Sequence, residues 1–179
     1  GDGIANLIVP LEPPQYLELL YIHDEATFRA RASSSLVERM ERGGGLESWA
    51  LRTWDLAAVE RQLGRERDPI DPDYYADGSQ PPWRYLSKPG ELLGYPFYIE
   101  YASPPEQRLE CWRERLREVG HRVQPGGIEW IEAVGDEADL LEWVAPARHL
   151  DIRIRAGKPA LRAAVRVGER LLMLSSDVS

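Results

Sequence analysis

The feature that most constrains this chain is an order of secondary structure that occurs twice. Residues 46–101 predict a strand, a helix and three further strands, and residues 127–175 predict the same order. A unit of roughly fifty residues that recurs indicates a repeated structural module. The two strands predicted at 4–11 and 15–22 have the character of the end of another such unit. The chain is therefore expected to be an α+β protein built from paired β-α-β-β-β modules.

Segments rich in glycine and proline separate these units, because both residues interrupt helices and strands. We expect five segments: the last two strands of an incomplete first module (1–24), a linker (25–45), a second β-α-β-β-β module (46–101), a helical connector (102–126) and a third β-α-β-β-β module (127–175).

The strand that opens the second module has two distinct faces. Side chains alternate along a strand, so Trp49 and Leu51 share one face and should pack on the helix predicted at 56–63. Ser48 and Arg52 share the other face. If the sheet is concave, this second face is the one that looks into the cavity.

Charge and cysteine usage exclude several classes of protein. The 30 acidic and 22 basic residues give a net charge of −8, which argues against a nucleic-acid-binding protein and favours a small or neutral ligand. No apolar run reaches the roughly 18–20 residues of a membrane helix, so no membrane partner is expected. Cys111 is the only cysteine, and we expect a reducing, cytoplasmic compartment.

The chain carries no short motif that identifies a reaction. It has no GxSxG, Walker, Rossmann, CxxC or kinase motif. His23, His121 and His149 lack the spacing of metal ligands. His23 follows a predicted strand and either lines the mouth of a pocket or lies in an exposed loop, and the loop is the simpler interpretation.

Five segments in order carry a resemblance to a known family: GDGIANLIVPL, QYLELLYI, ESWALRTWDLAAVERQLG, PFYIEYA and GGIEWIEAVGD. They resemble the vicinal oxygen chelate superfamily and, within it, the bacterial glyoxalase-like domain family. The resemblance implies a curved, mostly antiparallel sheet of paired modules that surrounds a metal and a small substrate.

The chain departs from the family pattern at its start. A family member would carry a strand and a helix before the segment that begins here at Gly3. That strand would supply one inward metal ligand. We therefore expect that 179 residues are not the whole functional unit, or that a partner chain covers the open sheet edge.

The resemblance assigns candidate roles to two carboxylates. In metal-dependent glyoxalases a Glu in the last strand of a module binds metal, and Glu18 in YLELLYI and Glu100 in FYIEYA match that position. Both are candidate catalytic residues and metal ligands. We expect their side chains to point into one concavity, although either can instead lie on an exposed sheet face.

The metal site implied by the resemblance is incomplete. The family takes further ligands from the first strand of each module, and in the second module that position is Ser48, a poor ligand for a transition metal. A divalent metal is therefore a candidate cofactor with an incomplete ligand set.

Candidate ligand-binding residues are Ser48, Arg52, Arg84 and Tyr98. An inward arginine would pair with Glu18 or Glu100, or would bind an anionic ligand.

Three functions fit these observations. The first is binding of a small organic molecule in a concave sheet pocket, as a lyase, isomerase or dioxygenase of the glyoxalase-like group. A lyase or isomerase would use Glu18 or Glu100 as general base next to a carbonyl. The second is sequestering or sensing of a small molecule without catalysis. The third is an interaction module in which the unit at 127–175 pairs with its copy in a homo-oligomer.

Overall fold

A computed structural model describes residues 3–12, 14–32, 34–70, 79–90, 93–123, 125–147 and 150–177. The strands are β1 (Ile4–Pro10), β2 (Tyr16–Ile22), β3 (Trp49–Arg52), β4 (Trp83–Leu86), β5 (Pro96–Tyr101), β6 (Pro125–Gly135), β7 (Ile152–Ala156), β8 (Ala160–Val167) and β9 (Arg170–Ser175). The α-helices are α1 (Glu25–Arg31), α2 (Ser34–Glu41), α3 (Leu56–Leu63), α4 (Pro105–Val119) and α5 (Glu137–Trp143), and a short 3-10 helix spans Ala145–Ala147. Of the three further strands expected in residues 46–101, β4 and β5 are described; residues 71–78 and His149 lie outside the described ranges.

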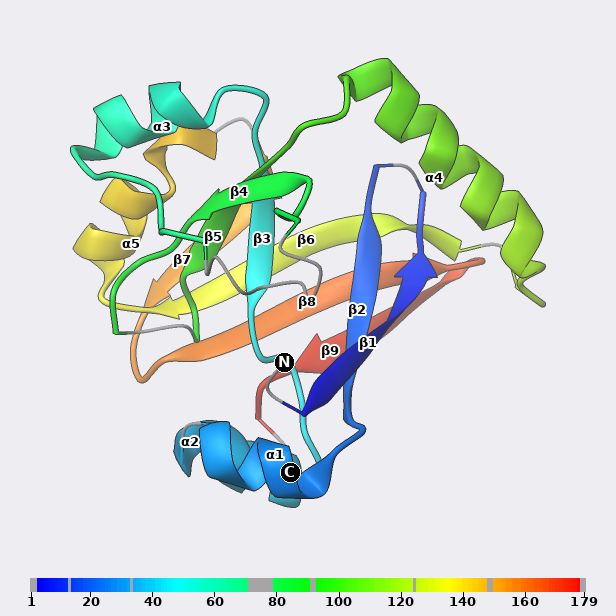
Figure 1. The fold of residues 1–179 in the computed structure, drawn as a ribbon, viewed down its shortest axis with the longest axis horizontal. Helices are drawn as coiled ribbons and strands as arrows, with labels where there is room; N and C mark the ends of the chain where they lie inside the picture. Colours follow the sequence, from blue (N-terminus) through cyan, green and yellow to red (C-terminus); the bar gives the residue numbers. More distant parts are fainter. Residues whose placement is uncertain are drawn as a thin grey trace.

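The strands form three hydrogen-bonded sheets, which Figure 1 shows between the helices. Their orders are β1-β2, β3-β5-β4 and β7-β6-β8-β9. The pairs β3–β5 and β6–β7 are parallel, and the other pairs are antiparallel. The predicted α+β class with mostly antiparallel strands is confirmed. None of the described helices is long and apolar enough to cross a membrane.

The two predicted modules differ in how their strands are connected. In the second module the first strand, β3, lies beside the last strand, β5. In the third module the first strand, β6, lies between β7 and β8. Among the described residues, the second predicted module has a strand, a helix and two strands, and the third has a strand, a helix and three strands. The order of the strands within the sheet also differs between the two. The boundaries of the modules remain a prediction.

Helices α3 and α5 both begin with an aspartate N-cap. The side chain of Asp55 accepts a hydrogen bond from the Ala58 amide at 2.8 Å, and Asp136 accepts one from the Asp139 amide at 3.0 Å. These bonds satisfy amide groups that have no partner inside a helix. Helix α3 ends at Gly64, whose φ of 63° suits a residue without a Cβ atom.

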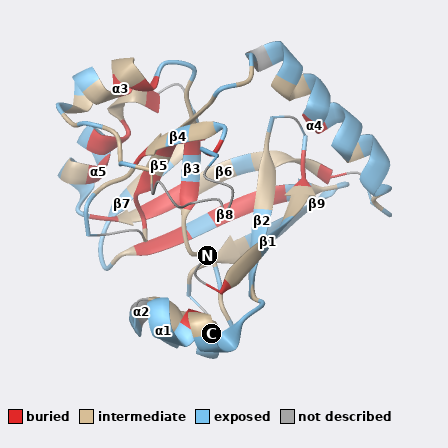
Figure 2. Cartoon of the chain, viewed as in Figure 1, coloured by how far each residue is buried: buried red, intermediate tan, exposed pale blue. Residues whose placement is uncertain are grey.

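The core lies where α3 and α5 meet the two larger sheets. Trp49 and Leu51 of β3 pack in it with Leu56 and Val59 of α3, as the alternation of β3 predicts. Figure 2 shows the buried residues concentrated in this part of the molecule. The buried cluster comprises Trp49, Leu51, Leu56, Val59, Leu86, Tyr95, Tyr98, Ala133, Leu140, Trp143, Val144, Ala147 and Leu161.

The large aromatic side chains of this core have hydrogen-bond partners for their polar atoms. The Tyr98 hydroxyl donates to the Trp143 carbonyl at 2.8 Å, and the Trp143 indole donates to the Pro96 carbonyl at 2.7 Å. The Trp49 indole donates to the Gly94 carbonyl at 3.1 Å. Because buried polar groups are costly when unpaired, these bonds fix β5 against α5.

Helix α4 is attached differently from the other long helices. Four apolar residues lie three or four positions apart along it, at Leu109, Trp112, Leu116 and Val119; Trp112 is buried, Leu109 and Leu116 are half-buried, and Val119 is 52% exposed. Figure 2 shows α4 largely exposed, and in Figure 1 it lies beside the β1–β2 hairpin, away from α3 and α5. Trp112 is thus the main anchor of α4.

The position of the core can be tested by comparing two adjacent leucines of α5. Leu140 is fully buried and Leu141 is 44% exposed. Leu140→Ala should lower the free energy of unfolding by about 2–5 kcal/mol, because it leaves a cavity. Leu141→Ala removes the same atoms from the surface and should cost less than about 1 kcal/mol. Urea unfolding of both variants measures these changes. An equal loss of stability in the two variants would contradict a core that contains Leu140 and excludes Leu141.

Candidate functional site

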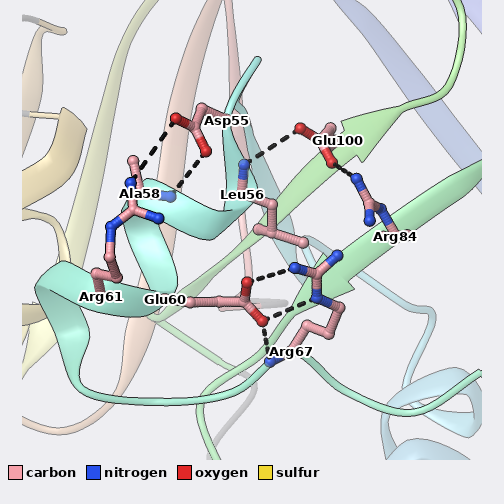
Figure 3. Close-up of polar contacts among 8 residues, drawn as sticks. All are labelled: Asp55, Leu56, Ala58, Glu60, Arg61, Arg67, Arg84 and Glu100. Carbon is pink, nitrogen blue, oxygen red and sulfur yellow. Dashed lines mark hydrogen bonds and ion pairs between the residues drawn. The ribbon is translucent and has the colours of Figure 1, made fainter.

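Glu100 lies on the side of β5 that faces α3. Its carboxylate accepts a hydrogen bond from the Leu56 amide at 3.2 Å and one from the Arg84 guanidinium. Arg84 is directly opposite Glu100 in the β4–β5 register. Figure 3 shows the carboxylate between the start of α3 and Arg84. A negative charge is favourable at a helix N-terminus, so Glu100 has a structural role here.

Neighbouring carboxylates around α3 also have partners. Glu60 accepts two hydrogen bonds from the Arg67 side chain, at 2.8 and 2.5 Å, and a third from the Arg67 amide at 2.8 Å. These bonds hold the pKa of Glu60 below its usual value. Asp55 lies 4.0 Å from Arg61 in addition to its capping role. Figure 3 shows these contacts as separate groups around α3: Asp55 with Ala58 and Arg61, Glu60 with Arg67, and Glu100 with Leu56 and Arg84.

Glu18 lies in a different environment from Glu100. It is exposed on β2, where the Asn6 side-chain amide donates to it at 3.4 Å. It shares a face of its strand with Tyr16, whose hydroxyl lies 2.7 Å from that of Tyr101. Tyr101 follows Glu100 along β5 and therefore points to the opposite face. The structure thus places the two carboxylates on opposite sides of the β3-β5-β4 sheet.

This arrangement corrects the expectation that the two carboxylates share a concavity. Alternation predicted which residues of β5 share a face, but the sequence did not show which face α3 would cover. Because Glu100 faces α3, the residues of β5 that face the other way are Ile99 and Tyr101. Arg52 pairs with Ile99 in the β3–β5 register and so lies on that second face.

The residues present do not fit the metal site that the resemblance implies. Both oxygens of Glu100 already accept hydrogen bonds, and Glu18 lies across the sheet from it. Ser48 lies half-buried just before β3. Within the described ranges, no group of three or more histidine, cysteine, aspartate or glutamate side chains could hold a metal ion. No catalytic step is therefore derived through a metal.

The other predicted ligand-binding residues have separate positions. Tyr98 is 2% exposed and belongs to the core, where it bonds to Trp143. Arg84 has a side chain that is 54% exposed and lines a pocket of about 500 Å³ beside Trp83 and Pro82. Its pairing with Glu100 agrees with the expectation that an arginine would neutralise that carboxylate.

Arg52 lies where β3, β5 and the turn before β2 meet. Its guanidinium donates to the Pro14 carbonyl at 2.9 Å. The central carbon of the guanidinium lies 5.7 Å from the ring centroid of Tyr101 and 5.7 Å from that of Trp54. Both distances are within the range of a cation–π contact.

Helix α4 adds a second arginine to the same ring. The guanidinium carbon of Arg108 lies 3.3 Å from the Tyr101 ring centroid and 5.5 Å from that of Trp112. Trp112 in turn stacks on Tyr16, with ring centroids 4.7 Å apart and planes at 20°. We refer to these side chains together as the Arg–Tyr cluster: Tyr16, Arg52, Tyr101, Arg108 and Trp112.

The cluster holds two guanidinium groups that lack a counter-ion among the described residues. Neither Arg52 nor Arg108 forms an ion pair with any described carboxylate. Burial lowers the pKa of Arg52, and the nearby charge of Arg108 lowers it further. Burial and the hydrogen bond with Tyr101 raise the pKa of Tyr16 well above its usual value, so the Tyr16 hydroxyl keeps its proton at neutral pH.

Several donors of the cluster are buried and have no acceptor among the described residues. They are Nε and Nη1 of Arg52, Nε of Arg108 and Nε1 of Trp112. Buried polar groups without a partner are few in native proteins, and each costs about 1–3 kcal/mol. Among the described residues, four such donors lie together in this cluster.

Sequence reasoning singled out Arg52 but missed the other members of the cluster. Arg108 and Trp112 are four residues apart on α4, a spacing that puts them on one helix face. That spacing was a usable signal for an arginine beside an aromatic ring. Tyr101 could have been found as the residue that follows Glu100 on the other face of the strand.

Comparison with known proteins gives one match. The sequence model of a family described as glyoxalase-like domain matches residues 1–147. The matched range covers β1 to β6 and α1 to α5, and β7 to β9 lie beyond it. No curated protein and no solved structure matches the chain significantly.

The role of Glu100 can be tested through stability. Glu100→Ala should lower the free energy of unfolding by about 0.5–2 kcal/mol, because α3 loses an acceptor at its first turn. Arg84→Ala should cost less than about 1 kcal/mol, since its side chain is 54% exposed. Chemical unfolding measures both. An unchanged stability for Glu100→Ala would contradict the structural role.

Proposed function

The chain belongs to the glyoxalase-like domain family, and from this premise we propose that it binds a small organic molecule at the Arg–Tyr cluster. The ligand lies on the face of β3 and β5 that is opposite to α3. Arg52 and the Tyr16–Tyr101 pair bind its oxygen atoms, and the aromatic rings contact its apolar part.

One observation carries the proposal: the buried guanidinium and indole donors that have no acceptor among the described residues. A ligand with oxygen acceptors supplies what these donors lack. Binding sites that are mostly apolar, with a few convergent polar groups, are the usual form of a small-molecule site. The cluster has this composition, because three aromatic rings surround two guanidinium groups.

An exposed aromatic ring lies beside the cluster and could contact the body of a ligand. Trp54 is 49% exposed and lies beside the Arg52 guanidinium. A flat exposed indole face is a favourable contact for an aromatic or planar group. The ligand therefore has a polar end at the cluster and a planar or apolar part against Trp54.

We favour binding without chemistry, as in a sequestering or sensing protein. The reason is that Glu100, one of the two candidate bases, is already engaged by α3 and Arg84. The alternative is a lyase or isomerase that removes a proton next to a carbonyl. In that case Glu18 is the available base, because it shares a strand face with Tyr16, and Arg52 would stabilise the enolate.

Binding can be tested with a defined panel of probes. Pyruvate, benzoate, benzamide and catechol are titrated into the protein while tryptophan fluorescence and calorimetry are recorded. At least one probe should bind saturably in a 1:1 complex. Arg52→Gln should weaken that binding at least about tenfold, which corresponds to 1.4 kcal/mol.

Arg153→Gln is the matched control. Arg153 is also a strand arginine over an indole, 4.3 Å from the Trp130 ring centroid, but it lies on another sheet. Its substitution should leave affinity within about twofold. The absence of binding by every probe, or an equal effect of both substitutions, would contradict the proposed site. Formation of a product from a bound probe, lost in Glu18→Gln, would favour the enzymatic alternative.

A further inference from the structure

We propose that the ligand of the Arg–Tyr cluster is an organic carboxylate, bound between Arg52 and Arg108, and that α4 moves to admit it. This inference rests on the proposed function and specifies the chemical class of the ligand. It follows from the charge balance of the cluster, from its hydrogen-bonding inventory and from the way in which α4 covers it.

The charge balance of the cluster is unusual because two guanidinium groups contact one phenol ring. Several arginines elsewhere are paired with carboxylates, for example Arg67 with Glu60 at 2.5 Å and Arg166 with Glu129 at 2.5 Å, and others donate to backbone carbonyls, as Arg65 does to Ser87. The chain has 30 acidic residues and a net charge of −8, so carboxylates are not scarce. Arg52 and Arg108 have buried donors and no ion pair with a described carboxylate, and a ligand would supply the negative charge that their burial requires.

The hydrogen-bond donors of the cluster also favour a negatively charged ligand. A guanidinium can only donate, and a carboxylate can accept about four hydrogen bonds. When one of the two tyrosine hydroxyls donates to the other, the accepting hydroxyl still has its own proton to give. The cluster thus presents donors from Arg52, Arg108 and one tyrosine. A carboxylate bound by two arginines satisfies this set, because guanidinium and carboxylate groups pair in a fork geometry.

The neighbours of the cluster favour a carboxylate on an apolar body over a small inorganic anion. Exposed Trp54 offers an aromatic face beside Arg52. Glu18 shares a strand face with Tyr16, and its negative charge opposes a second negative charge on the ligand. A ligand with one negative charge and a planar apolar part can contact the Trp54 ring and is repelled less by Glu18. A phosphate dianion has no apolar part to contact Trp54, and its second charge is repelled by Glu18.

The donors are out of contact with solvent, so a ligand can reach them only if a covering element moves. Two of the covering side chains, Arg108 and Trp112, come from α4. This helix starts after Pro104, which makes no side-chain capping bond, and ends at Gly120, whose φ is 62°. With Trp112 as its main anchor, α4 can shift as a unit and carry Arg108 with it. The helix therefore acts as a cover that contributes a ligand-binding arginine.

The chain provides a reporter for this movement. Cys111 is exposed on α4, next to Trp112, and it is the only cysteine of the sequence. An environment-sensitive fluorophore attached to Cys111 reports on α4 alone. The labelled full chain is titrated with benzoate, with benzamide as its neutral isostere, and with inorganic phosphate, all at one ionic strength. Calorimetry on unlabelled protein measures affinity independently.

The expected result is a saturable response to benzoate, with an affinity at least tenfold higher than for benzamide and phosphate. Arg52→Gln and Arg108→Gln should each weaken benzoate binding at least tenfold. Arg108→Lys, which keeps the charge but loses the fork, should weaken it less than Arg108→Gln. Arg166→Gln removes a surface arginine that is already paired and should change affinity less than twofold. Urea unfolding confirms that each variant is folded.

The outcomes that overturn the inference are distinct from failure of the proposed function. Equal affinity for benzoate and benzamide would leave a small-molecule site but contradict a carboxylate ligand. Tighter binding of phosphate would make the cluster an inorganic anion site. Benzoate binding in calorimetry without a response at Cys111 would contradict the movement of α4. If no probe of either charge binds, the proposed function itself fails.

Discussion

The structure depends on a reciprocal pair of hydrogen bonds between β5 and α5. The Tyr98 hydroxyl donates to the Trp143 carbonyl at 2.8 Å, and the Trp143 indole donates to the Pro96 carbonyl at 2.7 Å. Both side chains are nearly inaccessible to water, so the bonds form in a medium where an unpaired polar group is costly. These hydrogen bonds hold one face of β5 in the core and connect the second and third predicted modules.

Because one face of β5 is held against the core, alternation fixes the surroundings of each of its side chains. Glu100 faces the helices and caps α3, and Tyr101 is left to face the other way. The second face receives Arg52 from β3, Tyr16 from β2 and two side chains from the lightly attached helix α4. On the first side Glu100 is paired with Arg84, and on the second side Arg52 and Arg108 form no ion pair with a described carboxylate. Proteins commonly accept such a cost in stability at functional sites.

Local chemistry made much of this predictable. The packing of Trp49 and Leu51 on the helix at 56–63 follows from the alternation of side chains along a strand, and the structure confirms it. The direction in which β5 faces was not predictable, because alternation gives two faces without saying which one a helix covers. The role of α4 was not predictable either, since it depends on where a mostly polar helix docks. Strand order within the third module depends likewise on contacts distant in sequence.

If the Arg–Tyr cluster is a ligand site, Arg108 is not needed for the stability of the fold. The free energy of unfolding of Arg108→Gln, measured in low salt without any ligand, tests this. We expect a stability equal to or higher than that of the native chain, because the substitution removes a buried donor without an acceptor among the described residues and the repulsion with Arg52. A loss of more than about 1 kcal/mol, the size of a cation–π contact, would show instead that Arg108 stabilises the fold.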